Sequence, residues 1–216
     1  MHNEITPYQM DVLKEIGNIG ASSAATALSK LVNKRISISL PEIKILKFSN
    51  ITDIVGGEEV LTVGILQPMT GDITGNIMFL LRLQEAHDLA AFLIREMLNL
   101  VKEGDQPVDQ FDDMELSALR EAGNILISSY LSAISKLTDL SIIPDVPQMA
   151  IDMAGAILSV LAIEFGKVGD SVLYIASEFA QDAIKIGGDF FLVPDIESYN
   201  TLLRALGVGI QDDEHH

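Results

Sequence analysis

The sequence contains no cysteine and no tryptophan, and aromatic residues make up only 6% of the chain. Without cysteine, disulfide bonds, zinc sites built on thiolates and thiol nucleophiles are all excluded. The absence of cysteine is also consistent with a reducing compartment. Apolar residues make up 48% of the 216 residues, which is enough for a folded globular chain with a largely aliphatic core.

Basic residues are scarce, with 14 lysines and arginines against 31 acidic residues and a formal net charge of −17. So negative a surface repels phosphate backbones, so we expect no nucleic-acid binding. Long hydrophobic runs are lacking as well, since the longest, residues 154–163, ends at Glu164 and is too short to span a bilayer. The first residues do not have the pattern of a secretory signal. We therefore expect a cytoplasmic protein without membrane insertion.

Two long helices are predicted by their capping signals. Thr6 is a suitable N-cap, Pro7 suits the first helical position, and Gln9 completes a capping box, so a helix should run to about residue 31. A second helix should begin near Asp112, with Glu115 at the capping-box position, and run to about residue 136.

The remaining segments predict a mixture of strands and shorter helices. Strand patterns occupy residues 35–41, 60–66, 75–83, 171–175 and 190–193. Helices are expected at residues 84–101 and at residues 196–206, where Gly207 would stop the helix. Residues 68–72 resemble a hairpin turn, and the polar residues 102–110 resemble a linker.

The apolar segment at residues 149–165 is ambiguous, because its pattern suits a buried helix or a strand. Our interpretation is a short helix from about Asp152 followed by a strand. Asp152 would then be an N-cap, and a partner contact is the weaker alternative.

The two long helices carry the same pattern of residues, 106 positions apart. The matching positions, first copy then second, are Asp11 and Ser117, Glu15 and Glu121, Asn18 and Asn124, and Pro41 and Pro147. Two such patterns in register indicate an internal duplication.

Each pattern forms one polar stripe, because helical positions i, i+4 and i+7 fall within about 60° of one another. Ser22 extends the first stripe and Ser128 the second. The opposite helix faces are apolar, so each helix should be buried on one side and present its acid and amide on the other. A polar helix face is usually only solvated surface. Asn is unfavourable within a helix, however, so its recurrence beside Glu favours a functional stripe.

The pattern resembles that of the CheC/CheX/FliY family of response-regulator phosphatases, with CheC-like members the nearest match. The family motif is Asp or Ser, Glu four residues later, Asn three residues after that, and Pro twenty-three residues further on; both copies match it. The resemblance implies an α+β fold with an antiparallel sheet, pseudo-twofold symmetry and two exposed active helices. It also implies one domain over residues 1–216, made of two intertwined repeats at about 1–106 and 107–211.

The resemblance further implies a chemotaxis phosphatase that acts on the aspartyl phosphate of a CheY-type response regulator. Asn18 and Asn124 would each enter the regulator's active site and orient the attacking water, and Glu15 and Glu121 would pair with a lysine of the regulator. Weaker partner-binding roles would fall to the neighbouring stripe residues Asp11, Ser22, Ser117 and Ser128. The chain would need no cofactor or metal of its own, since Mg²⁺ would come from the regulator.

Two other functions are compatible with the same resemblance. The chain could be a weakly catalytic or non-catalytic adaptor that binds the receptor deamidase CheD or another chemotaxis or flagellar-switch protein. It could also be a structural part of the flagellar switch, although no appended switch domain is expected here. The histidines show no metal-ligand spacing: His87 is expected at the surface or its boundary, and His215 and His216 resemble a tag.

Overall fold

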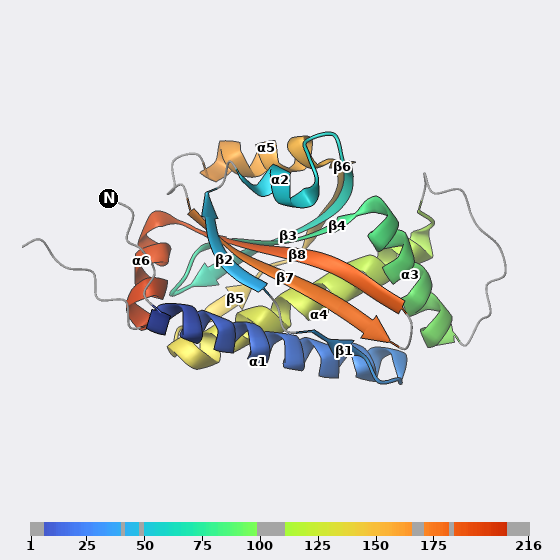
Figure 1. The fold of residues 1–216 in the computed structure, drawn as a ribbon, viewed down its shortest axis with the longest axis horizontal. Helices are drawn as coiled ribbons and strands as arrows, with labels where there is room; N and C mark the ends of the chain where they lie inside the picture. Colours follow the sequence, from blue (N-terminus) through green and yellow to red (C-terminus); the bar gives the residue numbers. More distant parts are fainter. Residues whose placement is uncertain are drawn as a thin grey trace, which may run out of the picture.

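The chain folds as two successive units with the same order of helices and strands (Figure 1). The computed structural model describes residues 7–39, 42–47, 50–98, 111–165, 171–181 and 184–206. The first unit comprises α1 (Pro7–Val32), β1 (Ser37–Ile38), β2 (Glu42–Lys47), α2 (Ile51–Val55), β3 (Leu61–Gly71), β4 (Gly75–Arg82) and α3 (Leu83–Leu98). The second comprises α4 (Asp113–Thr138), β5 (Ile142–Pro144), β6 (Gln148–Met153), α5 (Ala154–Phe165), β7 (Ser171–Gln181), β8 (Ile184–Pro194) and α6 (Ile196–Ala205).

The strands form one antiparallel sheet in which the two units are intertwined. The order is β1-β7-β8-β4-β3-β5, with β2 also paired to β7 and β6 also paired to β3. The short strands of each unit therefore add to the long strand of the other unit. Exchanging equivalent strands between the units leaves this pairing unchanged, so the sheet has a pseudo-twofold axis between β4 and β8. Phe79 and Phe190 lie directly opposite each other across that central pair, with stacked rings 4.4 Å apart.

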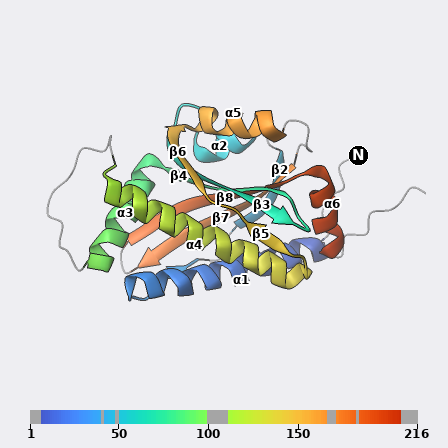
Figure 2. The same ribbon diagram turned by 180° about the vertical axis from the view of Figure 1, so that it is seen from behind.

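Helices cover both faces of the sheet. The long helices α1 and α4, with α3 beside them, pack on one face, and α2 and α5 pack on the other (Figures 1 and 2). Alternation along the strands supplies a core to each layer: Phe79 faces the long helices, and its neighbours Met78 and Leu80 face α2 and α5. The predicted α+β fold with an antiparallel sheet is confirmed.

The helix boundaries follow the capping signals where the structure describes them. The side chain of Asp112 accepts a hydrogen bond from the Glu115 backbone N–H at 2.8 Å, and the Glu115 carboxylate accepts one from the Asp112 N–H at 2.9 Å. This capping box confirms the predicted start of α4. The predictions made for Thr6, Pro41, residues 102–110, Gly207 and the terminal histidines lie outside the described residues.

The helix predicted from about Asp152 is present as α5, which begins at Ala154, but the predicted order is wrong, because the strand of this segment, β6, precedes the helix instead of following it. Long-range pairing with β3 decides the conformation here, with Ile151 opposite Val63 and Asp152 opposite Thr62. Asp152 is therefore a strand residue and not an N-cap; its carboxylate accepts a hydrogen bond from the Met153 N–H at 2.7 Å. A local apolar run carries no information about such pairing.

The predicted hairpin is present, since β3 and β4 pair antiparallel, but the position predicted for its turn is wrong: β3 continues to Gly71, and residues 72–74 make the turn. Pro68 is tolerated because it falls where the edge partner of β3 changes from β6, whose pairing ends at Leu66, to β5, whose pairing begins at Met69. No ladder hydrogen bond to that edge is needed from its missing N–H. The strand predicted at 35–41 is described only as β1, and β2 was not predicted.

The long helices approach each other closely at Gly20, which lies against the ring of Tyr130 on α4. A Cβ built on Gly20 would lie 2.8 Å from Tyr130 Cε1 and closer still to Cδ1. Tyr130 is fully buried, and its hydroxyl hydrogen-bonds to the Ser177 hydroxyl of β7 at 2.6 Å. The ring therefore joins α1, α4 and the sheet at one point.

Replacing Gly20 with Ala should destabilise the protein by about 1–3 kcal/mol, because the added methyl overpacks against the Tyr130 ring. Ala favours a helix over Gly by about 1 kcal/mol, so in a Tyr130→Ala background the same change should become neutral or stabilising. Urea unfolding of the four proteins measures both effects. Equal destabilisation in the two backgrounds would show that the ring is not what excludes the methyl group.

Candidate functional site

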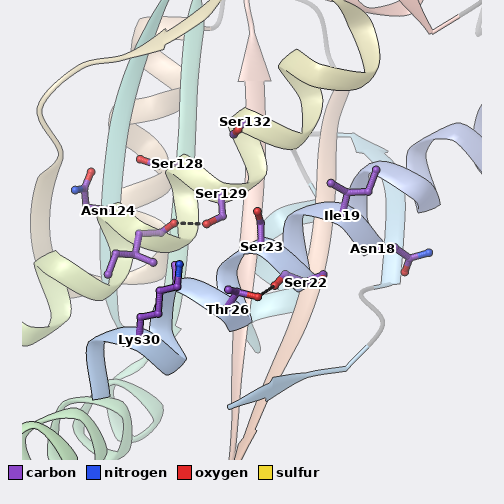
Figure 3. A pocket seen from close by; sticks show the side chains of 12 residues that line it. Asn18, Ile19, Ser22, Ser23, Thr26, Lys30, Asn124, Ser128, Ser129 and Ser132 are labelled. Carbon is purple, nitrogen blue, oxygen red and sulfur yellow. Dashed lines mark hydrogen bonds between the residues drawn. The ribbon is translucent and has the colours of Figure 1, made fainter. Parts of the chain in front are cut away.

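An open groove of about 800 Å³ runs between α1 and α4, which lie side by side and antiparallel (Figures 1 and 3). Small hydroxyl residues from both helices line it: Ser22, Ser23, Thr26, Ser128, Ser129 and Ser132. Some of these hydroxyls bond within their own helix, as Ser129 does to the Ile125 carbonyl at 2.7 Å and Thr26 to the Ser22 carbonyl at 2.9 Å. The groove therefore presents hydroxyl groups from both helices beside apolar side chains, and the described residues that line it include no histidine or carboxylate that could activate a serine.

Asn18 and Asn124 lie toward opposite ends of this groove and point away from each other (Figure 3). Both side chains are half-buried, so neither is packed inside the core. The apolar face of each helix is buried, as Leu13 and Leu119 show. The structure thus places one carboxamide from each helix at the surface, on the same side of the molecule.

The other predicted stripe residues are also accessible. Glu15 and Glu121 are exposed one turn before each asparagine, and Asp11 and Ser117 are exposed one turn earlier still. Among the described residues, Asp11 forms a long surface ion pair of 3.7 Å with Lys14. Ser22 is exposed and Ser128 is half-buried, and both line the groove. The two stripes share a surface, and their asparagines are set apart along it.

The side chain of Asn124 is hydrogen-bonded by Gln67 of β3, in the sheet on which α4 packs. The Gln67 side-chain nitrogen donates to the Asn124 side-chain oxygen at 3.4 Å and to the Asp145 backbone carbonyl at 2.7 Å. Gln67 is only 2% exposed, and its own side-chain oxygen has no hydrogen-bond partner among the described residues. Sequence reasoning missed this residue, because nothing local to β3 marks it.

Asn18 has no equivalent support among the described residues. The pairing of the sheet identifies the equivalent position in the other unit. Leu66 pairs with Gln148, the first residue of β6, and Ala176 pairs with Glu42, the first residue of the equivalent strand β2, so Leu66 and Ala176 are equivalent. The position equivalent to Gln67 is therefore Ser177. Its short side chain is buried and its hydroxyl is already bonded to Tyr130.

Each stripe is continued at its N-terminal end by an exposed apolar side chain. Tyr8 is 66% exposed and Met114 is 52% exposed. Each lies three residues before the first stripe residue of its helix, so both fall on the same helix face as the stripes. Their common offset of 106 residues is a sequence signal that could have identified them.

Positive charge lies near the groove despite the net charge of −17. Lys30, in the last turn of α1, is exposed and lines the groove, and in Figure 3 its side chain extends toward α4. A second hollow of about 580 Å³ adjoins it and is lined by Lys30, Lys34 and Arg35 among others. Lys34 forms an ion pair with the buried carboxylate of Glu96. Lys34, together with Arg95, lowers the pKa of this carboxyl, although burial by itself raises it. These basic side chains therefore make the electrostatic potential near the groove more favourable for an acidic partner than the net charge of the chain suggests.

Other kinds of site find little support in the described part of the chain. No group of three His, Asp or Glu side chains there is placed to hold a metal ion. His87 is half-buried, as expected, and its ring stacks on Phe111 with centroids 3.8 Å apart. None of the described helices combines the length and apolarity that crossing a bilayer requires.

Comparison with known proteins places the chain in a family. The CheC-like family model matches residues 9–45 and 114–151, which contain the two stripes and the prolines that follow them. The CheY-P phosphatase CheC of Bacillus subtilis (strain 168) is 35% identical over 212 residues, covering 96% of this chain and 98% of that protein. The chain therefore belongs to the CheC-like family.

Solved structures show the same fold. FliY of Thermotoga maritima superposes with a TM-score of 0.69 at 23% identity, covering 94% of this chain and 99% of that chain. FliM of H. pylori, from a complex with SpeE, gives 0.67 at 12% identity and covers 94% and 97%. Identities this low support a shared fold and nothing more specific.

The Tyr130–Ser177 bond beneath the groove should be visible in the pH dependence of stability. Burial raises the pKa of the Tyr130 hydroxyl to about 12, although the Ser177 hydrogen bond opposes the shift. Unfolded tyrosine ionises at about 10, so the stabilisation is complete below pH 10 and is lost as the pH rises toward 12. The loss should reach about 2–3 kcal/mol. Denaturant unfolding of wild type and Tyr130→Phe between pH 9 and 12 measures this loss. If the free energy of unfolding fell equally with pH in both proteins, the Tyr130 hydroxyl would not have a raised pKa.

Proposed function

We propose that this protein is a phosphatase that hydrolyses the aspartyl phosphate of a CheY-type response regulator. The observation that carries the proposal is the pair of half-buried asparagines, each with an exposed glutamate one turn earlier, on one accessible surface. The B. subtilis relative, matched over nearly its full length, is named a CheY-P phosphatase. The proposed localisation is the cytoplasm, where such a regulator would be met.

In the proposed reaction, water attacks the phosphorus in line with the bond to the aspartyl oxygen. That P–O bond breaks, the aspartate carboxylate leaves, and the proton of the water passes to phosphate or solvent. Asn18 or Asn124 would hydrogen-bond the water and hold it in line, since a carboxamide can both donate and accept. No covalent intermediate on this chain is needed, because positioning is the main requirement of phosphoryl transfer.

The stripe residues around each asparagine would dock the regulator. Glu15 and Glu121 would each pair with a lysine of the regulator and set the register of the helix. Asp11, Ser22, Ser117 and Ser128 would add weaker polar contacts. Mg²⁺ would be held by the regulator's own acidic residues, so the chain is proposed to need no metal or cofactor of its own.

The adaptor function remains the second candidate. Exposed apolar side chains on β6 and α5, among them Ile151, Met153 and Val160, lie away from the groove and would suit a further partner. Binding of CheD, or of another chemotaxis or flagellar-switch protein, is thus compatible with phosphatase activity at the groove. An adaptor alone would not require an asparagine in each stripe.

Replacing the asparagines tests the proposed function. Phosphate release from a phosphorylated CheY-type regulator should fall partially in Asn18→Ala and in Asn124→Ala, and almost to the regulator's own rate in the double variant. Each single change leaves one site able to position water. Asn200→Ala on α6 serves as the matched control. Equal rates for wild type and the double variant would favour the adaptor.

The apolar extension of the stripe should contribute to docking. In the Asn18→Ala background, Met114→Ser should raise KM about fivefold without lowering kcat, because about 1 kcal/mol of apolar burial would be lost on binding. Met97→Ser is the control, since Met97 is 47% exposed on α3, outside the groove. An unchanged KM would show that Met114 lies outside the contact surface.

A further inference from the structure

The orientation of the Gln67 side chain is fixed by the protein itself. Its nitrogen lies 2.7 Å from the Asp145 backbone carbonyl, which can only accept a hydrogen bond. A flipped amide would place two oxygens at that distance, so Gln67 must present its NH₂ group there. The second hydrogen of this NH₂ is then available to Asn124, whose side-chain oxygen it contacts at 3.4 Å.

The orientation of Asn124 follows from that of Gln67. Because Gln67 offers a donor, Asn124 must turn its oxygen toward the sheet and its own NH₂ group away from it. The contact is long, and such contacts commonly shorten when a partner is bound. The orientation of the Asn124 amide is thus set before a partner binds, which lowers the conformational entropy lost on binding.

The loop that supplies the carbonyl is itself restrained. Asp145 donates its backbone N–H to the Pro68 carbonyl at 2.8 Å, which holds the loop against β3. Pro147, two residues on, limits its own φ and the conformation of Val146 before it. The motif's proline therefore lies in the loop whose carbonyl orients Gln67.

In the other unit, the equivalent loop makes the same backbone hydrogen bond to the sheet, but the position of Gln67 is not occupied by an amide side chain. Ser39, equivalent to Asp145, donates its N–H to the Glu178 carbonyl at 2.9 Å. Ser177 stands in place of Gln67, and its hydroxyl bonds to Tyr130. No side-chain hydrogen bond holds Asn18 within the described part of the chain.

We propose that Gln67 is a positioning residue for Asn124, and that the two phosphatase sites differ because only one is oriented in advance by a buried amide from the sheet. This inference rests on the proposed function. Gln67 does not touch the reacting atoms; it acts by holding the carboxamide that does. Loss of its donor leaves Asn124 in place but free to rotate, which lowers the fraction of encounters with correctly oriented water.

The experiment isolates each site before changing Gln67. Gln67→Met keeps the side-chain length without a donor, and Gln67→Ser installs the residue found at the equivalent position. In the Asn18→Ala protein, where only Asn124 acts, either change is expected to lower kcat about tenfold with KM unchanged. In the Asn124→Ala protein, where only Asn18 acts, the same change is expected to leave kcat and KM unaltered.

The two backgrounds separate positioning from a general structural effect. A loss of similar size in both would mean that Gln67 matters only for folding, and no loss in the Asn18→Ala protein would mean that it does not position Asn124; either result overturns the inference. If one Gln67 variant does not fold, as judged by urea unfolding, the other provides the comparison.

A second measurement does not depend on activity. In nitrogen-15 NMR spectra of the intact chain, Gln67→Met should shift the side-chain NH₂ signals of Asn124 and leave those of Asn18 in place. Unshifted Asn124 signals overturn the inference even if the enzyme is active. Conversely, a wild-type chain that releases phosphate no faster than the regulator alone overturns the proposed function, whatever the spectra show of the hydrogen bond.

Discussion

The close contact between α1 and α4 at Gly20 and Tyr130 is the constraint on which the groove depends. A glycine on α1 allows the aromatic ring of α4 to lie directly against the helix backbone. The ring also reaches the sheet, where its hydroxyl meets Ser177. The two helices are thus fixed to each other and to β7 at one buried point. Their polar stripes must then share a surface, with the asparagines a set distance apart along it.

The intertwined sheet makes the Asn124 site a product of both units. Asn124 lies on a helix of the second unit, whereas Gln67 comes from a strand of the first. The same holds for the loop at Asp145, which packs on Pro68 of β3. Because the short strands of each unit complete the sheet of the other, the support of a site forms only when both units fold together.

The sequence was sufficient for those features that depend on local spacing. The capping box at Asp112, the two long helices and the exposure of Glu15 and Glu121 all follow from residues a few positions apart. Features set by pairing across the sheet could not be predicted in this way. The strand at β6 is imposed by β3, and Gln67 reaches Asn124 from 57 positions away in the chain. The roles of the site residues and the boundaries of the two repeats remain predictions.

The helix contact itself differs between the two units by one buried hydroxyl, that of Tyr130. At the helix contact, Gly20 faces Tyr130; by the 106-residue repeat, the equivalent positions are Leu126 and Ala24, which are also buried. Each pair of positions combines a small residue with a large one. Only Tyr130 brings a polar group that must be satisfied when buried. Ser177 satisfies it, and among the described residues no hydrogen bond joins the Ser177 hydroxyl to Asn18. Ala24 carries no polar group, and Gln67, at the position equivalent to Ser177, donates a hydrogen bond to Asn124.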